Sequence, residues 1–252
     1  MDFLISVAII AIVVTFIYFI SNKNSKSNYK KTSLENKKKT SSKPEKNSQS
    51  ESNTGATLTL NTLNKYVNPK KSEDLIKYSI PSSFSILDDN ALKECINLTE
   101  LCIHDKLFLL QDKSFINCVN LININVHEDN KNYYSKLGVL FSKDHKQLIT
   151  YPSSKQSSTY FIPQEVENIN SHAFTNNKYL KYIIVPNSVT TISENAFVNC
   201  KSIKQIVVPQ NVITIHPRAF SICPRLSVRG YRNSIAENYC KKYYIPFEYL
   251  SN

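Results

Sequence analysis

The most restrictive feature of this chain is a set of short sequence strings that recur every 23 residues. Two kinds of string keep the interval: Phe161-Ile162-Pro163, Ile184-Val185-Pro186 and Val207-Val208-Pro209, and then Ala173-Phe174, Ala196-Phe197 and Ala219-Phe220. A fixed period of this length is typical of a solenoid, in which each unit forms one coil that stacks on the next. The period therefore predicts a repeat architecture.

Within one repeat, the spacing of the apolar residues changes along the coil. Residues 182–185 alternate before Pro186 as in a short strand, and Val189 with Ile192 predicts a second short strand. Residues 196–203 carry apolar side chains at intervals of three and four, which is typical of a helical turn. We therefore expect an α/β leucine-rich-repeat solenoid with short strands and one short helical turn in each coil.

The same interval continues toward the N-terminus, as Leu75, Leu98 and Leu121 show. Between His127 and Pro163 the step in residue number is 36, which is one repeat plus an insertion of 13. We expect about six coils in residues 57–252, with an N-terminal cap in residues 57–72. Residues 233–244 predict an amphipathic helix with Asn233 or Ser234 as N-cap, and residues 246–250 predict a last strand.

Residues 184–203, which read Ile-Val-Pro-Asn-Ser-Val-Thr-Thr-Ile-Ser-Glu-Asn-Ala-Phe-Val-Asn-Cys-Lys-Ser-Ile, resemble the repeat of BspA-like leucine-rich repeat proteins. Residues 130–144 with 148–152 are similar to the inserted hairpin of that family, and residues 228–247 to its terminal cap. The resemblance places a hairpin at about 128–160 and a cap at about 228–252. It implies a surface or secreted interaction module without catalytic residues or cofactors.

One feature departs from the family pattern. Family members often have Gly after the second strand, where this chain has Asn170, Ser193 and His216. The departure leaves the tightness of this turn open.

Phe3 to Ile20 is an uncharged apolar run. A helix of this length spans ~27 Å, close to the ~30 Å hydrocarbon core of a bilayer. The alternative is a cleaved signal peptide, which needs a positive segment before the apolar run, but only Asp2 and the terminal amine stand there. We therefore expect residues 1–21 to form a retained single-pass transmembrane anchor.

Residues 22–56 contain nine Lys and three Glu and almost no large apolar residue, which predicts a disordered basic linker. Its lysines either contact anionic lipids or only enforce topology, and one aromatic residue, Tyr29, argues against nucleic-acid binding. Because the lysines follow the apolar run, the positive-inside rule places the repeats in the cytoplasm. The cell surface is the alternative, and the family resemblance points to it.

Candidates for chemistry are few. Cys95, Cys118, Cys200 and Cys223 share one repeat position and are expected to be small buried residues, as free thiols. Other candidates are His104 and His127 as a metal pair with Asp105 or Glu128, and Cys240 as a nucleophile. Solvated turn residues are the competing interpretation for the histidines, no catalytic spacing surrounds Cys240, and no metal or cofactor is expected.

The stronger candidate is a surface. If Ile183 and Val185 point inward, their strand neighbours point outward, and the last coils then present an apolar row where the first coils are polar. The predicted binding surface comprises Phe161, Tyr182, Ile184, Gln205 and Val207. An exposed apolar patch usually marks an interface. The alternative is that the row packs under the cap or the hairpin.

Together these features predict a non-catalytic, membrane-anchored scaffold that binds a protein partner through its repeat surface. One alternative is an extracellular surface adhesin of the same fold. Another, from a different class, is a thiol-dependent or metal-dependent hydrolase.

Overall fold

We describe a computed structural model of the chain for residues 56–59, 77–89, 91–92, 95–111, 113–116 and 118–250. All of them belong to one compact unit, Asn53–Asn252. The predicted anchor Phe3–Ile20, residues 22–55 of the linker and residues 60–72 of the predicted N-terminal cap lie outside the described residues. Within the described ranges, no helix has the length and apolarity needed to cross a bilayer.

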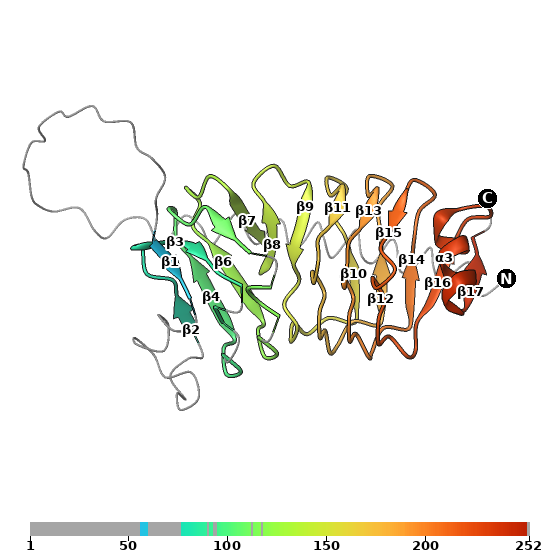
Figure 1. The fold of residues 1–252 in the computed structure, drawn as a ribbon, viewed down its shortest axis with the longest axis horizontal. Helices are drawn as coiled ribbons and strands as arrows, with labels where there is room; N and C mark the ends of the chain where they lie inside the picture. The colour runs from blue at the N-terminus through green and yellow to red at the C-terminus, as the bar shows by residue number, and fades with distance from the viewer. Residues whose placement is uncertain are drawn as a thin grey trace, which may run out of the picture. The chain divides into compact units, whose positions relative to one another are not determined.

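The described unit is a solenoid in which every coil contributes strands to two columns (Figure 1). The first column contains a three-stranded sheet of β2 (Lys77–Ser79), β4 (Glu100–Ile103) and β6 (Asn123–Val126). It continues as a five-stranded sheet of β10 (Thr159–Phe161), β12 (Tyr182–Ile184), β14 (Gln205–Val207), β16 (Ser227–Gly230) and β17 (Phe247–Tyr249). We call these the N-terminal sheet and the C-terminal sheet.

The second column lies on the other side of each coil and is also split into two sheets (Figure 1). One contains β1 (Ala56–Leu58), β3 (Phe84–Leu87) and β5 (Leu109–Leu110). The other contains β7 (Tyr133–Lys136), β8 (Val139–Ser142), β9 (Gln147–Thr150), β11 (Asn168–Ile169), β13 (Thr191–Ile192) and β15 (Thr214–Ile215). Strand β1 begins at Ala56, the last residue of the predicted linker, so the first strand begins one residue before the predicted boundary.

Strand pairing confirms the stacking of equivalent positions. Ile183 of β12 pairs in parallel with Ile206 of β14, and Ile192 of β13 pairs with Ile215 of β15. In each pair the two residue numbers differ by 23, which is the period of the sequence. Parallel strands lie ~4.8 Å apart, so each side chain rests on its equivalent in the next coil. The apolar columns between the strands form the core because no coil can bury its own apolar side.

The column of aromatic rings is the clearest example of this stacking. The ring centroids of Phe174 and Phe197 are 4.7 Å apart, and those of Phe197 and Phe220 are 5.1 Å apart, with nearly parallel planes. Tyr151 stacks on Phe174 at 5.2 Å, and Tyr239 of the terminal helix meets Phe220 edge to face at 5.6 Å. The column is therefore closed at its C-terminal end by a ring from the cap.

The segment expected to be a helical turn is a series of turns, so the predicted α/β class is corrected to a β-solenoid with little helix. Left-handed residues interrupt it at two places in each of two coils. They are His172 (φ 60°) and Asn176 (φ 60°), then Asn195 (φ 54°) and Asn199 (φ 59°). A right-handed helix needs φ near about −60° at every residue and cannot continue through them.

Hydrogen bonds between coils explain why these turns replace a helix. The Phe174 N–H donates to the Ala196 carbonyl at 2.7 Å, and the Phe197 N–H donates to the Ala219 carbonyl at 2.8 Å. The turn backbone thus alternates between bonds to the next coil and bonds three residues back within its own turns, such as Thr175 N–H to the His172 carbonyl. The left-handed residues lie two and six positions after Asn170, so the absence of Gly there does not open the turn.

The 13-residue insertion forms an antiparallel hairpin, β7 with β8, and the stacking continues across it. Two residues make its tight turn, Leu137 (φ 51°) and Gly138 (φ 79°), as hairpin turns of this kind require. On the far side of the insertion, the Ser153 hydroxyl donates to the Cys118 carbonyl at 2.7 Å. Asn177 then donates to the Pro152 carbonyl at 3.3 Å, which ties the next coil to the same stack.

The predicted terminal helix is present as α3 (Ile235–Tyr243) and is followed by β17. Ser234 is its N-cap, and its side chain accepts a hydrogen bond from the Glu237 N–H. The buried Glu237 carboxylate accepts from Lys241, Tyr249 and Asn233, and these partners lower its pKa to about 2. The Glu237 carboxylate thus links the residue before α3, the helix itself and β17.

The aromatic column gives a direct test of the stacking. Replacing Phe197 by Ala removes a fully buried ring that contacts rings on both sides, and we expect a loss of about 3–5 kcal/mol in the free energy of unfolding. The measurement is urea denaturation followed by circular dichroism. Phe161→Ala is the control, since Phe161 is 46% exposed and should cost about 1 kcal/mol or less. Equal losses in the two variants would contradict the column.

The left-handed turns give a second test. Ile222 occupies the position of Asn176 and Asn199 and has φ 61°, although a β-branched residue is strained there. Its side chain is 63% exposed, so Ile222→Asn loses little burial and should stabilise the protein by about 1 kcal/mol. Ile213→Asn is the control, because Ile213 is 68% exposed and has no positive φ. A shift of the thermal midpoint in both variants, or in neither, would refute the strain argument.

Candidate partner-binding face

The five residues of the predicted binding surface lie together on the outer side of the C-terminal sheet. Register places Phe161, Ile184 and Val207 in one row across β10, β12 and β14. Tyr182 and Gln205 form the neighbouring row, two residues earlier on their strands. We call these five residues the apolar row. Its geometry follows from the strand pairing, which leaves each side chain no freedom of register.

Alternation along the strands decides which side chains reach the surface. Ile183 and Ile206 are fully buried in the core. Their neighbours point the other way: Phe161 is 46% and Tyr182 is 42% exposed, while Ile184, Gln205 and Val207 are half-buried beside adjacent strands. Side chains that the alternation predicts to point inward are therefore buried, and those that it predicts to point outward are exposed or half-buried.

The row ends in an ion pair that sequence reasoning missed. Val207 pairs with Arg229 of β16, and Arg229 pairs with Glu248 of β17. The Arg229 Nε lies 3.5 Å from a Glu248 carboxylate oxygen, and the Gln205 amide donates to the same carboxylate at 3.2 Å. From Val207 to Arg229 the step in residue number is 22 instead of 23, so a strict period points to the wrong residue.

The corresponding side of the N-terminal sheet is polar and internally bonded. The Lys77 ammonium lies 2.8 Å from the Glu100 carboxylate, which also accepts from the Asn125 amide at 2.6 Å. Asn123 donates in turn to Asn125 at 3.0 Å. Because these groups satisfy one another, this part of the surface has less need of an external partner than the apolar row.

The hairpin separates the two parts of the face. The Ile124 N–H of β6 donates to the Gly138 carbonyl at 3.1 Å, so the hairpin turn occupies the edge that would otherwise continue toward β10. A side chain at Gly138 would collide with the Asn123 amide, and its positive φ also favours glycine. The polar surface therefore ends at β6 and the apolar row begins at β10.

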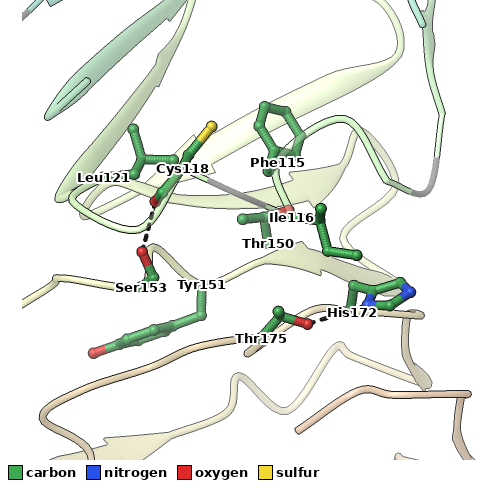
Figure 2. A pocket seen from close by; sticks show the side chains of 9 residues that line it. All are labelled: Phe115, Ile116, Cys118, Leu121, Thr150, Tyr151, Ser153, His172 and Thr175. Carbon is green, nitrogen blue, oxygen red and sulfur yellow. Dashed lines mark hydrogen bonds between the residues drawn. The ribbon is translucent and has the colours of Figure 1, made fainter. Parts of the chain in front are cut away.

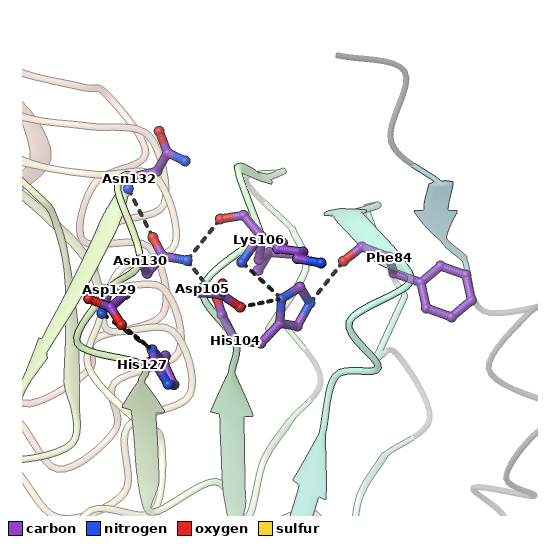
Figure 3. A network of polar contacts seen from close by, with 9 residues as sticks. Phe84, His104, Asp105, Lys106, His127, Asp129, Asn130 and Asn132 are labelled. Carbon is purple, nitrogen blue, oxygen red and sulfur yellow. Dashed lines mark hydrogen bonds and ion pairs between the residues drawn. The ribbon is translucent and has the colours of Figure 1, made fainter. Parts of the chain in front are cut away.

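His104 and His127, the candidate metal pair, form hydrogen bonds with nearby backbone groups (Figure 3). The Lys106 N–H donates to His104 Nδ1 at 3.1 Å, which leaves the Nε2–H to donate to the Phe84 carbonyl at 2.9 Å. Both ring nitrogens are thus engaged. His127 Nδ1 accepts from the Asp129 N–H at 3.3 Å. No group of three or more metal-ligating side chains occurs among the described residues.

Asn130 is a structural residue that sequence reasoning did not single out. Its buried amide donates to the His104 carbonyl at 2.8 Å, and its oxygen accepts from the Asn132 N–H (Figure 3). The amide also donates to the Leu107 carbonyl at 2.9 Å, and the oxygen also accepts from the Tyr133 N–H. It joins the last regular coil to the start of the hairpin. The only sequence signal was its position at the opening of the insertion.

All six cysteines are free thiols. Three of the four thiols at the shared repeat position donate to a carbonyl of the preceding coil: Cys118 to Leu92 at 3.7 Å, Cys200 to Phe174 at 3.0 Å and Cys223 to Phe197 at 3.0 Å. These residues are therefore hydrogen-bond donors between coils as well as small core residues. Cys240 is buried in α3, and burial raises its pKa to about 12, which is unfavourable for a nucleophile.

A cavity lies where the insertion interrupts the regular stack (Figure 2). Its volume is about 20 Å³, and Cys118, Tyr151, Ser153, His172 and Thr175 are among its lining residues. A water molecule needs roughly 10–15 Å³ measured in this way, whereas small-molecule sites are of order ~300–1,000 Å³. The cavity has room for about one water molecule and is too small for a substrate.

Comparison with known families agrees with this geometry. The family model for the BspA type leucine-rich repeat region matches residues 58–143 and 149–240 in six copies, more than half of the chain. The chain belongs to the BspA-type leucine-rich repeat family. Residues 144–148, which follow the hairpin and lead into β9, separate the two matched segments. No curated protein shows a significant match.

Solved leucine-rich repeat structures resemble this BspA-type chain. A leucine-rich repeat protein from Eubacterium ventriosum has a TM-score of 0.53 and 22% identity, covering 62% of this chain and 54% of the other. A leucine rich cell surface protein from Faecalibacterium prausnitzii has a TM-score of 0.45 and 23% identity, covering 62% and 54%. The chain thus spans about half the length of these structures. At this identity the similarity shows the fold alone.

Thiol reactivity tests the hydrolase alternative in this BspA-type protein. With a pKa of about 12, only about one Cys240 side chain in ten thousand is a thiolate at pH 8. We expect iodoacetamide at pH 8 to label Cys240 roughly 10³-fold more slowly in the native protein than in urea. Cys102 and Cys223 are half-buried and are expected to react before the four buried thiols. Peptide mass spectrometry reports each site, and rapid native labelling of Cys240 would restore the nucleophile hypothesis.

Proposed function

We propose that the protein is a non-catalytic repeat scaffold that binds a protein partner on the apolar row. The observation that carries this proposal is the exposure of Phe161 and Tyr182 on the paired strands β10 and β12, whose register is fixed by parallel pairing. Neither the hairpin nor the cap covers these two side chains. The alternative in which the row is packed under one of those elements is therefore disfavoured.

The chemistry of the row supports protein binding. Aromatic rings supply large contact area with little conformational freedom to lose, and Tyr adds a hydroxyl that can pair with a polar group of the partner. Paired strands hold these rings rigidly, so their ordering is complete before association. The five residues, three of them half-buried, fit the centre of an interface better than a freely solvated surface.

We propose further that the run Phe3–Ile20 tethers this scaffold to a membrane through the lysine-rich residues 22–56. Two locations remain open for the repeats. The lysines after the run and the free thiols favour the cytoplasmic side, whereas the family favours the cell surface. Protease treatment of intact cells separates them, because only repeats outside the cell are digested.

A double substitution tests the binding face. Ile184→Lys with Val207→Lys places two charges in the row, and their flexible stems can extend to solvent, so we expect cooperative melting to persist with a loss of about 1–3 kcal/mol. Partner cross-linking in the cells of origin should fall at least tenfold, because burying an unpaired charge at an interface is unfavourable. The measurement is quantitative mass spectrometry after cross-linking of the full chain.

Ser79→Lys with Asn125→Lys is the matched control for this variant. Both residues are exposed and occupy the equivalent row of the N-terminal sheet. The control should keep the partner. If it loses the partner equally, or if the Ile184 and Val207 variant keeps it, the apolar row is not the binding face. Loss of cooperative melting would show instead that the row belongs to the core.

A further inference from the structure

Five lysines lie along one edge of the C-terminal coils, at the segments that lead into the strands of the C-terminal sheet. They occupy two repeat positions and recur at the period of the sequence: Lys155, Lys178 and Lys201 in one column, and Lys181 and Lys204 in the other. The Lys204 N–H donates to the Lys181 carbonyl at 2.8 Å, so the second column is stacked backbone on backbone. We call these five residues the lysine edge.

The lysine edge has no acidic counterpart on the described part of the chain. In these coils and the cap, four of the five carboxylates are paired with other cations: Glu167 with Lys146, Glu194 with Arg218, Glu248 with Arg229 and Glu237 with Lys241. The fifth, the exposed Glu165, forms no salt bridge with a described residue. Lys178 donates to the Asn120 amide oxygen at 2.9 Å, and no lysine of the edge forms a salt bridge with a described residue.

The segments themselves contain no acidic residue. Residues 155–158, 178–181, 201–204 and 224–227 hold the five lysines and Arg225, but no Asp or Glu. Like charges one strand spacing apart repel one another, and nothing in the core requires lysine at these positions. The equivalent segments of earlier coils contain no lysine: 96–99 and 119–122 are uncharged, and 73–76 holds Glu73 and Asp74, so the edge is confined to the coils that carry the apolar row.

The lysine edge and the apolar row form one continuous surface. Lys181 directly precedes Tyr182, and Lys204 directly precedes Gln205, so the cations border the row along its length. Tyr179, which is 42% exposed, lies between two lysines of the edge. An apolar centre with a charged rim on one side is the usual anatomy of a protein interface. Such a rim selects partners by charge complementarity and accelerates their association.

We infer that the partner of the apolar row is an acidic polypeptide segment, with apolar side chains that fill the row and carboxylates that face the lysine edge. This inference rests on the proposed function and specifies its partner. The half-buried Lys155, whose pKa burial lowers, would gain a compensating carboxylate on binding. A polysaccharide or nucleic acid would engage the cations and could stack on Phe161 and Tyr182, but it has no aliphatic groups to pack on Ile184 and Val207, and these make the polypeptide the better fit.

A defined polymer pair tests the inference on the full chain in a non-ionic detergent. The probes are fluorescent poly-L-glutamate and a random copolymer of glutamate and tyrosine, with binding measured by anisotropy at low and at physiological salt. We expect the copolymer to bind more tightly than poly-L-glutamate and both to weaken with salt. Replacing Lys178, Lys181 and Lys201 together by Gln should weaken both about tenfold at low salt.

A charge-matched control removes three other exposed lysines, by Lys106→Gln, Lys113→Gln and Lys131→Gln. This variant should bind both polymers nearly as well as the unchanged protein. An equal loss in the control would overturn the inference, because net charge alone would then explain binding. Tighter binding of dextran sulfate or single-stranded DNA than of the copolymer, lost in the edge variant, would overturn it in favour of those ligands.

A second variant separates failure of the inference from failure of the proposed function. Ile184→Asn with Val207→Asn should remove the advantage of the tyrosine copolymer and leave binding of poly-L-glutamate unchanged. If that advantage never exists while the edge variant still loses binding, the apolar row fails as a binding face. If the advantage exists and the edge variant binds as well as the control, the row stands and the acidic partner is refuted.

Discussion

Contact between identical positions of successive coils is the constraint on which the rest of the molecule depends. Parallel pairing joins Ile183 to Ile206, and the rings of Phe174 and Phe197 stack at 4.7 Å. Turn backbones and the Cys200 thiol also donate hydrogen bonds to neighbouring coils. Each coil therefore supplies hydrogen-bond and packing partners to its neighbour. The strand register then fixes the position of the core side chains in their columns.

The constraint also governs how the chain departs from its period. The hairpin adds residues, yet Ser153 and Asn177 restore the contacts between coils on its far side. The price of the interruption is local: a cavity of about 20 Å³ and a break between β6 and β10. At the C-terminus, Tyr239 closes the ring column, and Glu237 holds the cap together. The hairpin and the cap are thus irregular segments past which the contacts between stacked coils are maintained.

The same constraint turns the outer side of the strands into a patterned surface. Lys77, Glu100 and Asn125 satisfy one another on the N-terminal sheet, whereas Phe161 and Tyr182 stay exposed on the C-terminal sheet. The backbone is the same in both places, so the outward side chains alone set the difference. The outward side chains, with the apolar row at the centre and lysines along its border, therefore decide which partner chemistry the paired strands can bind.

The sequence by itself determined the period, the core columns, the capping helix and the inward or outward direction of residues such as Ile183 and Tyr182, because these follow from spacing along one chain. Tyr151 lies 23 residues before Phe174 and so keeps the period, but only the structure showed that its ring joins the column directly after the insertion. Left-handed turns at Asn176 and Asn199 replaced the expected helix because hydrogen bonds to other coils set their φ. Exposure of the row was likewise decided only in three dimensions, by where the hairpin and cap come to rest.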